Sequence, residues 1–155
     1  MGLFKKKLFA KRPDFSDGII DLYPSDLVEA NEELGVKKTF MFRISPCETL
    51  KNAGRISLRI GESRELYYFG HIGYHVNEGY RGNHYALNAC SMMLPLLRAL
   101  GVRSLVITTD VDNIPSRKTC ERLGCKLESI VFVPQDLQRR FDLPEQKCRY
   151  ILVVE

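Results

Sequence analysis

The hydrophobic pattern of this chain changes its period at residue 79, and this change limits the folds that the chain can adopt. Before that point apolar and polar residues alternate, which is typical of a strand with one buried face. The clearest case has apolar residues at Ile56, Leu58 and Ile60. After it, apolar residues recur at steps of three and four, which indicates a helix with one buried stripe: Ala86, Cys90, Met93, Leu97 and Leu100. Strands followed by a long helix place the chain among mixed α and β folds.

The region before the helix carries several strand signals. Residues 18–23 form a short predicted strand that Pro24 ends, and Ser25 then caps a short helix through Glu29. Three further strands are expected, at residues 38–44, 54–60 and 66–76. Their short polar connections predict an antiparallel meander.

The long helix contains Pro95, which predicts a kink because proline removes the amide bond to Ser91. The remaining expected elements are a strand at 104–109, a helix at 114–123 and strands at 126–133 and 147–154, the last two separated by a polar loop. The predicted fold class is therefore α/β (α+β), with a mixed, mostly antiparallel sheet, a central β-α-β crossover and flanking helices.

Composition limits the domain count and the classes of partner. A chain of 155 residues fits one domain, and 45% hydrophobic with 27% charged residues is ordinary for a globular protein. The net charge of +4 owes much to the first twelve residues. We therefore expect a basic arm at 1–17 and one domain at 18–155, with neither a nucleic-acid surface nor a membrane span.

The five cysteines (an odd number, with no CxxC pair) argue against a disulfide framework. They also lack the short spacing that a zinc site uses, so no metal is expected. A reducing cytoplasm is the simplest location for such a chain.

The stretch around residues 76–90 predicts an anion site. A strand runs into a tight glycine-containing loop, and the loop opens the long helix. Amides at a helix N-terminus point outward unpaired, and the helix dipole adds partial positive charge. On these residues alone, an ordinary structural turn remains an alternative.

This loop resembles motif A of the GNAT superfamily of acyl-CoA N-acetyltransferases, an Arg/Gln-x-x-Gly-x-Gly/Ala loop that wraps the CoA pyrophosphate. Arg81 and Ala86 match the ends of that pattern, Gly82 follows the arginine as is common, and His84 stands where the family has its inner glycine. The later segment from Asn113 resembles a second motif of the family, with a small residue three positions on and a glycine eleven positions on: Ser116 and Gly124. The resemblance covers residues 54–133 and looks closest to the branch of ribosomal-protein N-terminal acetyltransferases, through the run from Ile72 to Glu78.

The resemblance implies an enzyme that moves an acetyl group from acetyl-CoA to a primary amine by direct attack in a ternary complex. The acceptor would be a small amine or a peptide. The thioester oxygen would accept a bond from the Val76 or Asn77 amide, and Asn113, with Ser116 beside it, would contact the cofactor arm. The pyrophosphate would lie on the amides of Arg81, Gly82, Asn83, His84, Tyr85 and Ala86.

The same resemblance implies catalytic roles for three side chains. Glu78 matches a proposed general base, and Ser116 matches a hydroxyl proposed as the acid. Cys120 occupies the position at which many members have an acidic tyrosine. Each has a plainer interpretation, respectively a solvated carboxylate, a first-turn helix residue and a buried thiol.

Other interpretations remain open. His71 and His75 share one strand face. Either would be a base or a substrate contact, or both would be ordinary sheet histidines with satisfied hydrogen bonds. Tyr74 points to the opposite face and is expected in the core. The chain as a whole would alternatively be a non-catalytic acyl-CoA-binding module, or a polyanion binder that uses the basic arm. Strand edges in such small domains often pair, which would give a homodimer.

Overall fold

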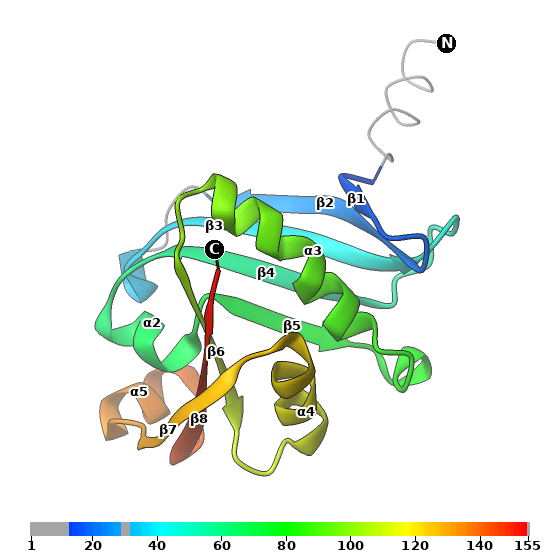
Figure 1. Cartoon of the computed structure of the whole chain (residues 1–155). Coiled ribbons are helices and arrows are strands. Elements are labelled where there is room, and N and C mark those ends of the chain that lie inside the picture. The colour runs from blue at the N-terminus through cyan, green and yellow to red at the C-terminus, as the bar shows by residue number, and fades with distance from the viewer. Residues whose placement is uncertain (1–12, 29–31, 155) are drawn as a thin grey trace.

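The structure is a computed structural model that describes residues 13–28 and 32–154 (Figure 1). Most of the predicted basic arm lies outside these residues. The larger of two sheets is antiparallel, and its strands follow the order of the chain. They are β1 (Phe15–Ser16), β2 (Ile20–Val28), β3 (Val36–Pro46), β4 (Gly54–Gly61) and β5 (Ile72–Val76). Residues 15 and 16 of the predicted arm thus pair with β2 as β1.

The smaller sheet is also antiparallel, in the order β6-β8-β7. Its strands are β6 (Ser104–Asp110), β7 (Lys126–Phe132) and β8 (Gln146–Val153). The helices are α2 (Arg64–Phe69), α3 (Tyr85–Ala99), α4 (Ile114–Leu123) and α5 (Gln135–Phe141), with 3-10 turns η1 (Glu32–Leu34) and η2 (Glu78–Tyr80). No helix in the described part of the chain has the length and apolarity needed to cross a membrane.

The main core lies between α3 and one face of the larger sheet, where α3 runs across the strands (Figure 1). Helix α3 supplies Cys90, Met93 and Leu97 of the predicted stripe together with Ala89, and β4 supplies the alternating Ile56 and Leu58, all with no exposed surface. Each large aliphatic side chain buried in this way contributes about 1.5–3 kcal/mol. The middle of the predicted helix stripe is confirmed, whereas Ala86 is half-buried and Leu100 follows α3 and is 40% exposed. The strand alternation is confirmed in β4, and the two patterns determine which face of this sheet is covered.

The predicted helix after Pro24 is wrong. Strand β2 continues through Pro24 to Val28, and the pairing with β3 shifts register between Pro24 and Leu27. A bulge of this kind accommodates a residue that has no amide hydrogen to give to the ladder. The end of the predicted helix, Glu29, lies outside the described residues.

The predicted strand at 66–76 is half wrong, because its first residues form α2. Ser63 begins the helix: its Oγ accepts the Leu66 amide at 2.9 Å and donates to the Leu34 carbonyl at 2.6 Å. Gly70 then ends the helix with φ of +77°. Strand β5 keeps only the second half of the predicted segment.

The predicted crossover joins two different sheets. Helix α3 connects β5 with β6, but β5 is the edge strand of the larger sheet and β6 belongs to the smaller one. An isolated bridge between Gly70 and Ile107 links them. A Cβ on Gly70 would lie 2.9 Å from the Val106 carbonyl oxygen, so the close approach requires glycine.

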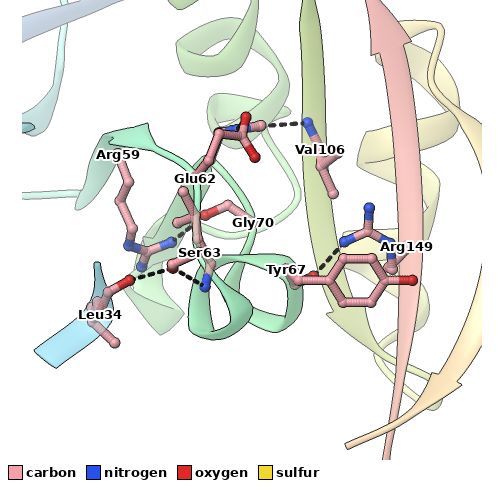
Figure 2. Close-up of polar contacts among 10 residues, drawn as sticks. Leu34, Arg59, Glu62, Ser63, Tyr67, Gly70, Val106 and Arg149 are labelled. Atoms are coloured by element: carbon pink, nitrogen blue, oxygen red, sulfur yellow. Dashed lines mark hydrogen bonds and ion pairs between the residues drawn. The ribbon is translucent and has the colours of Figure 1, made fainter. Parts of the chain in front are cut away.

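Largely buried polar side chains hold the two sheets together at this point, which we call the junction (Figure 2). Arg59 Nη1 donates to the Gly70 carbonyl at 3.1 Å, and the Val106 amide donates to His71 Nδ1 at 3.0 Å. Arg149, which is 7% exposed, donates to the Tyr67 carbonyl and lies 3.5 Å over the Tyr67 ring. The Arg149 Nε also donates to Glu128 at 3.2 Å.

Two smaller expectations concern prolines. Helix α3 contains Pro95 and continues to Ala99, and the predicted kink at Pro95 stays a prediction. The predicted polar loop between the last two strands contains α5, which begins directly after Pro134. Helix α5 packs beside α2 through an ion pair between Arg64 and Asp136 at 2.8 Å.

Candidate functional site

A cavity of about 590 Å³ opens where β5 ends and α3 and α4 begin. Its walls come from the last three residues of β5, the loop at 80–84, the start of α3 and one face of α4. Eight of the ten predicted cofactor-binding residues line it: Val76, Arg81, Gly82, His84, Tyr85, Ala86, Asn113 and Ser116. Segments far apart in sequence thus form one site, which we call the cofactor cavity.

The loop end of the cofactor cavity is built for an anion. Helix α3 begins at Tyr85, so the amides of its first turn have no partner within the helix. His84, which stands in place of the family glycine, has φ of +60°. This left-handed conformation is the one that glycine adopts most readily, which explains why the family prefers glycine at this position. The loop keeps that shape with a histidine in it.

Cations surround the same end of the cavity. Arg81, Lys118 and Arg122 line it, whereas no aspartate or glutamate is among the described residues of its lining. Arg122 Nη1 lies 3.1 Å from His84 Nδ1. Since arginine can only donate, Nδ1 is the acceptor. This contact ties α4 to the loop and places a guanidinium near the amides of α3.

The open edge of β5 forms the other wall. In an antiparallel ladder, successive amides of a strand point alternately to its two sides. The backbone amide of Asn77 donates to the Ala53 carbonyl at 2.8 Å, so this amide points toward β4 rather than into the cavity. Val76, one residue earlier, therefore directs its amide outward. The Val76 carbonyl accepts Arg81 Nε at 2.9 Å.

A half-buried hydroxyl pair lies in the wall of the cavity. Tyr74 Oη lies 2.7 Å from Ser116 Oγ and 4.0 Å from Cys120 Sγ. Burial, first of all, raises the pKa of the Tyr74 phenol well above its ordinary value, so the phenol stays protonated at neutral pH. Burial likewise raises the pKa of Cys120 to about 12. The Tyr74–Ser116 pair thus presents a hydroxyl to the cavity, and Cys120 lies beneath it with no exposed surface.

Asn113 holds the start of α4. Its Oδ1 accepts the Ser116 amide at 3.2 Å, with Pro115 in the first turn. This is an ordinary N-cap, and it leaves the side-chain NH₂ as a donor at the cavity wall.

Four predicted site residues lie elsewhere. Asn77 lines a different cavity, and Asn83 Nδ2 donates to the Tyr80 carbonyl at 2.9 Å. Glu78 is exposed on η2 and lines neither cavity, and Cys120 is in the core.

The cationic face of α4 and the position of Tyr74 in the cavity lining were not predicted from the sequence. Lys118, Thr119 and Arg122 follow Pro115 at steps of three and four, so they share one helix face. That spacing was a readable signal. Tyr74 points to the inner face as expected, but the end of that face is open to the cavity.

The two histidines of the strand face have different environments. His71 belongs to the junction, where burial lowers its pKa and its Nε2 lies 3.8 Å from Glu62. His75 is exposed and lines both the cofactor cavity and a second cavity on the opposite face of the larger sheet. His75 therefore belongs to the lining of both cavities.

The comparison with protein families agrees with this geometry. A model described as an acetyltransferase (GNAT) domain matches residues 20–126. The chain belongs to the GNAT acetyltransferase family. The match includes the loop, α3 and the whole of α4, so the cofactor cavity lies within the GNAT domain. A search of curated proteins found no match.

Solved structures resemble the GNAT domain in fold. One is the microcin C7 self-immunity acetyltransferase MccE in complex with acetyl-CoA and AMP, with 24% identity, 75% of this chain and 61% of that one covered, and a TM-score of 0.59. Another is the ribosomal L7/L12 α-N-protein acetyltransferase RimL in complex with coenzyme A. It has 20% identity, with 75% of this chain and 62% of that one covered, and a TM-score of 0.58. A third is the ribosomal-protein-S5-alanine acetyltransferase from Vibrio fischeri. It has 18% identity, with 80% of this chain and 64% of that one covered, and a TM-score of 0.58. The chain spans about three-fifths of the length of these proteins.

Proposed function

We propose that this GNAT domain transfers the acetyl group of acetyl-CoA to a primary amine. The observation that carries the proposal is that one cavity is lined by the start of α3 with its unpaired amides, by the end of β5 and by the Tyr74–Ser116 hydroxyl pair. These features match the parts of a thioester cofactor: phosphates, a pantetheine arm with amides, and a reacting sulfur.

The pyrophosphate would lie at the start of α3, where unpaired amides and the helix dipole favour an anion. Arg122 and Lys118 would add charge-assisted bonds to phosphate oxygens, and His84 would yield its contact with Arg122 to them. The pantetheine arm would run along the outer edge of β5, where Arg81 must release the Val76 carbonyl to it. The Val76 amide would donate to the thioester oxygen.

The reaction then needs two proton movements. The amine nitrogen loses a proton, attacks the thioester carbon and forms the C–N bond, while the oxygen takes the negative charge. Collapse of that intermediate breaks the C–S bond and leaves a thiolate, which a proton or hydrogen bond stabilises. The products are an amide and CoA.

For the base, the geometry favours His75, which lies where the two cavities meet. Glu78, further along the loop, remains a second candidate that would act through a water. The thiol-release rates of the His75→Gln and Glu78→Gln variants separate the two, because only loss of the base slows amine attack.

For the acid, the Tyr74–Ser116 pair is the better placed group. Its phenol is protonated and lies in the cavity wall, so it can donate to the leaving thiolate directly or through Ser116. Cys120 would act only by way of Tyr74 Oη, 4.0 Å away.

The alternative is a non-catalytic acyl-CoA-binding module. The contact between His84 and Arg122 favours it, because that contact occupies donors that a pyrophosphate needs. Acetyl-CoA would then bind without amine-dependent release of thiol.

The test is a thiol-release assay with acetyl-CoA over a panel of amines and peptides, alongside calorimetric titration of acetyl-CoA. Amine-dependent release establishes the enzyme. Binding of acetyl-CoA with no thiol release for any acceptor favours the non-catalytic acyl-CoA-binding module. If acetyl-CoA does not bind, both the enzyme and the binding module are excluded.

We also propose a reducing compartment such as the cytoplasm, since all five cysteines are free thiols. A homodimer stays a proposal. Strand β7 exposes Ile130 and Phe132 at the edge of the smaller sheet, and sedimentation would show whether two copies cover them.

A further inference from the structure

The second cavity lies on the face of the larger sheet that α3 does not cover, and it holds about 540 Å³. One row of side chains crosses this face through four paired strands: Tyr23 with Arg43, Arg43 with Arg55, and Arg55 with His75. Directly paired residues point to the same face, so the two arginines stand side by side. We call this cavity the arginine groove.

The charge of the arginine groove is not balanced by the described part of the protein. Arg43, Arg55 and His75 line it, and none of its described lining residues is an aspartate or glutamate. Among the carboxylates whose side chains the structure describes, none forms an ion pair with Arg43 or Arg55. Asp21, the acidic residue in the next row of this face, accepts the Glu48 amide instead.

Such an arrangement costs stability in the free protein. Like charges directly opposite one another on a sheet repel. Arg43 is nevertheless held in place, since its Nε donates to Ser45 at 3.2 Å and its guanidinium lies 4.7 Å over the Tyr23 ring. Arg55 is exposed beside it. Two neighbouring guanidinium groups, one of them held in position, are well suited to bind a carboxylate or a phosphate through charge-assisted hydrogen bonds.

The groove also has the right position for the acceptor of the proposed reaction. It meets the cofactor cavity at His75, so an amine that approaches the thioester from this side lies at the β5 end of the row. Strands are spaced by about 4.8 Å, so the arginines of β4 and β3 lie roughly 5–10 Å from that end. An anion at that distance from the amine would neutralise them.

We propose that the acceptor is a small primary amine that carries a carboxylate or phosphate, held by Arg55 and Arg43 in the arginine groove. This inference rests on the proposed acetyl transfer and narrows its substrate class. The amine is presented to His75 while the anionic group stays on the arginines. A neutral amine of the same length lacks the second anchor.

The experiment compares acceptors that differ only in the anionic group: 6-aminohexanoate against hexylamine, and O-phosphoethanolamine against ethanolamine. We expect kcat/KM to favour an anionic acceptor by about tenfold or more, the worth of one charge-assisted contact. In Arg55→Gln, the kcat/KM values of an anionic acceptor and its neutral partner should differ by no more than about twofold, because only the value for the anionic acceptor falls. The carboxylate and phosphate pairs show which anion is preferred.

Arg98→Gln is the matched control, because it removes the same charge from the exposed end of α3 and should keep the preference. Equal rates for both members of each pair, or a preference that Arg55→Gln leaves intact, would overturn the inference while acetyl transfer itself stands. A second readout needs no turnover: titration of both anionic acceptors and their neutral partners into the protein, with and without CoA. Arg55-dependent binding of at least one anionic acceptor, without binding of its neutral partner, supports the inference. Equal or absent binding within both pairs overturns it. Failure of acetyl-CoA to bind would instead count against the proposed function.

Discussion

The junction and the two cavities use the same residue type for opposite purposes. At the junction, Arg149 is buried and Arg59 is half-buried, and backbone carbonyls and aromatic rings surround their guanidinium groups (Figure 2). In the cavities, Arg55 and Arg122 are exposed, and no carboxylate of the described residues lines the walls beside them. A buried cation must be satisfied by the protein, whereas an exposed cation in a concave wall is available to a ligand.

This difference predicts that substitutions at the junction change the free energy of unfolding and leave cofactor affinity unchanged. Substitutions in the cofactor cavity should do the reverse. Four experiments test this division, in order of expected effect.

Arg149→Ala should have the largest effect. The change removes the bond to the Tyr67 carbonyl and leaves Glu128 without its 3.2 Å partner. We expect a loss of about 3 kcal/mol in the free energy of unfolding, measured by denaturant titration. Arg139→Ala, on the exposed side of α5, is the control and should cost under about 0.5 kcal/mol. Equal losses in the two variants would contradict a structural role for Arg149.

Gly70→Ala tests the close approach of the two sheets. The new Cβ would lie 2.9 Å from the Val106 carbonyl oxygen, in a residue with φ of +77°. We expect about 2–3 kcal/mol of destabilisation, of which the backbone conformation alone accounts for about 1 kcal/mol. Gly101→Ala isolates that part, because Gly101 has φ of +78° and a Cβ added there would meet no described atom within 4 Å. Two variants of equal stability would mean that the sheets separate without cost.

Arg122→Gln addresses the cofactor cavity. It removes a cation from the loop end, so the dissociation constant of acetyl-CoA should rise about tenfold, or 1.4 kcal/mol. Stability should change by less than about 0.5 kcal/mol. Arg103→Gln, an exposed residue before β6, controls for net charge. The comparison between junction and cavity fails if Arg122→Gln unfolds more easily but binds acetyl-CoA normally.

The smallest effect concerns pH. Burial lowers the pKa of His71 in the folded protein, with Glu62 opposing that shift. The unfolded chain then binds a proton at this residue more readily than the folded one. The contribution of His71 to the free energy of unfolding is therefore fully present above about pH 6.5 and is lost as the pH falls below that value. His71→Gln should flatten the curve of stability against pH between about 7 and 5. A wild-type curve that is flat over this range would show that His71 is not buried as neutral imidazole.

The sequence predicted those parts of the site that depend on local chemistry. The loop at 80–84 and the start of α4 at Ile114 are encoded by glycine, asparagine and proline within a few residues of each other. Helix α2 was missed because the run from Leu66 to Phe69 is rich in aromatic residues and too short to show a helical period. The Ser63 cap was the one local sign of it.

The arginine groove was beyond sequence reasoning for a different cause. Alternation places Arg55 on the polar face of its strand, but only the register of β3 against β4 brings Arg43 beside it. The same holds for the contact between Arg122 and His84, which depends on how α4 packs against the loop. Long-range pairing of this kind leaves no trace in local patterns.

Calorimetric titration of acetyl-CoA into the wild-type protein and into Arg122→Gln is the decisive experiment for the cofactor cavity. We predict one site with a dissociation constant of about 10 μM, or roughly −7 kcal/mol, weakened about tenfold in the variant. An absence of binding at about 1 mM acetyl-CoA, where even −4 kcal/mol would be detected, would show that the cofactor cavity does not take this ligand. That result would contradict the proposed acetyl transfer.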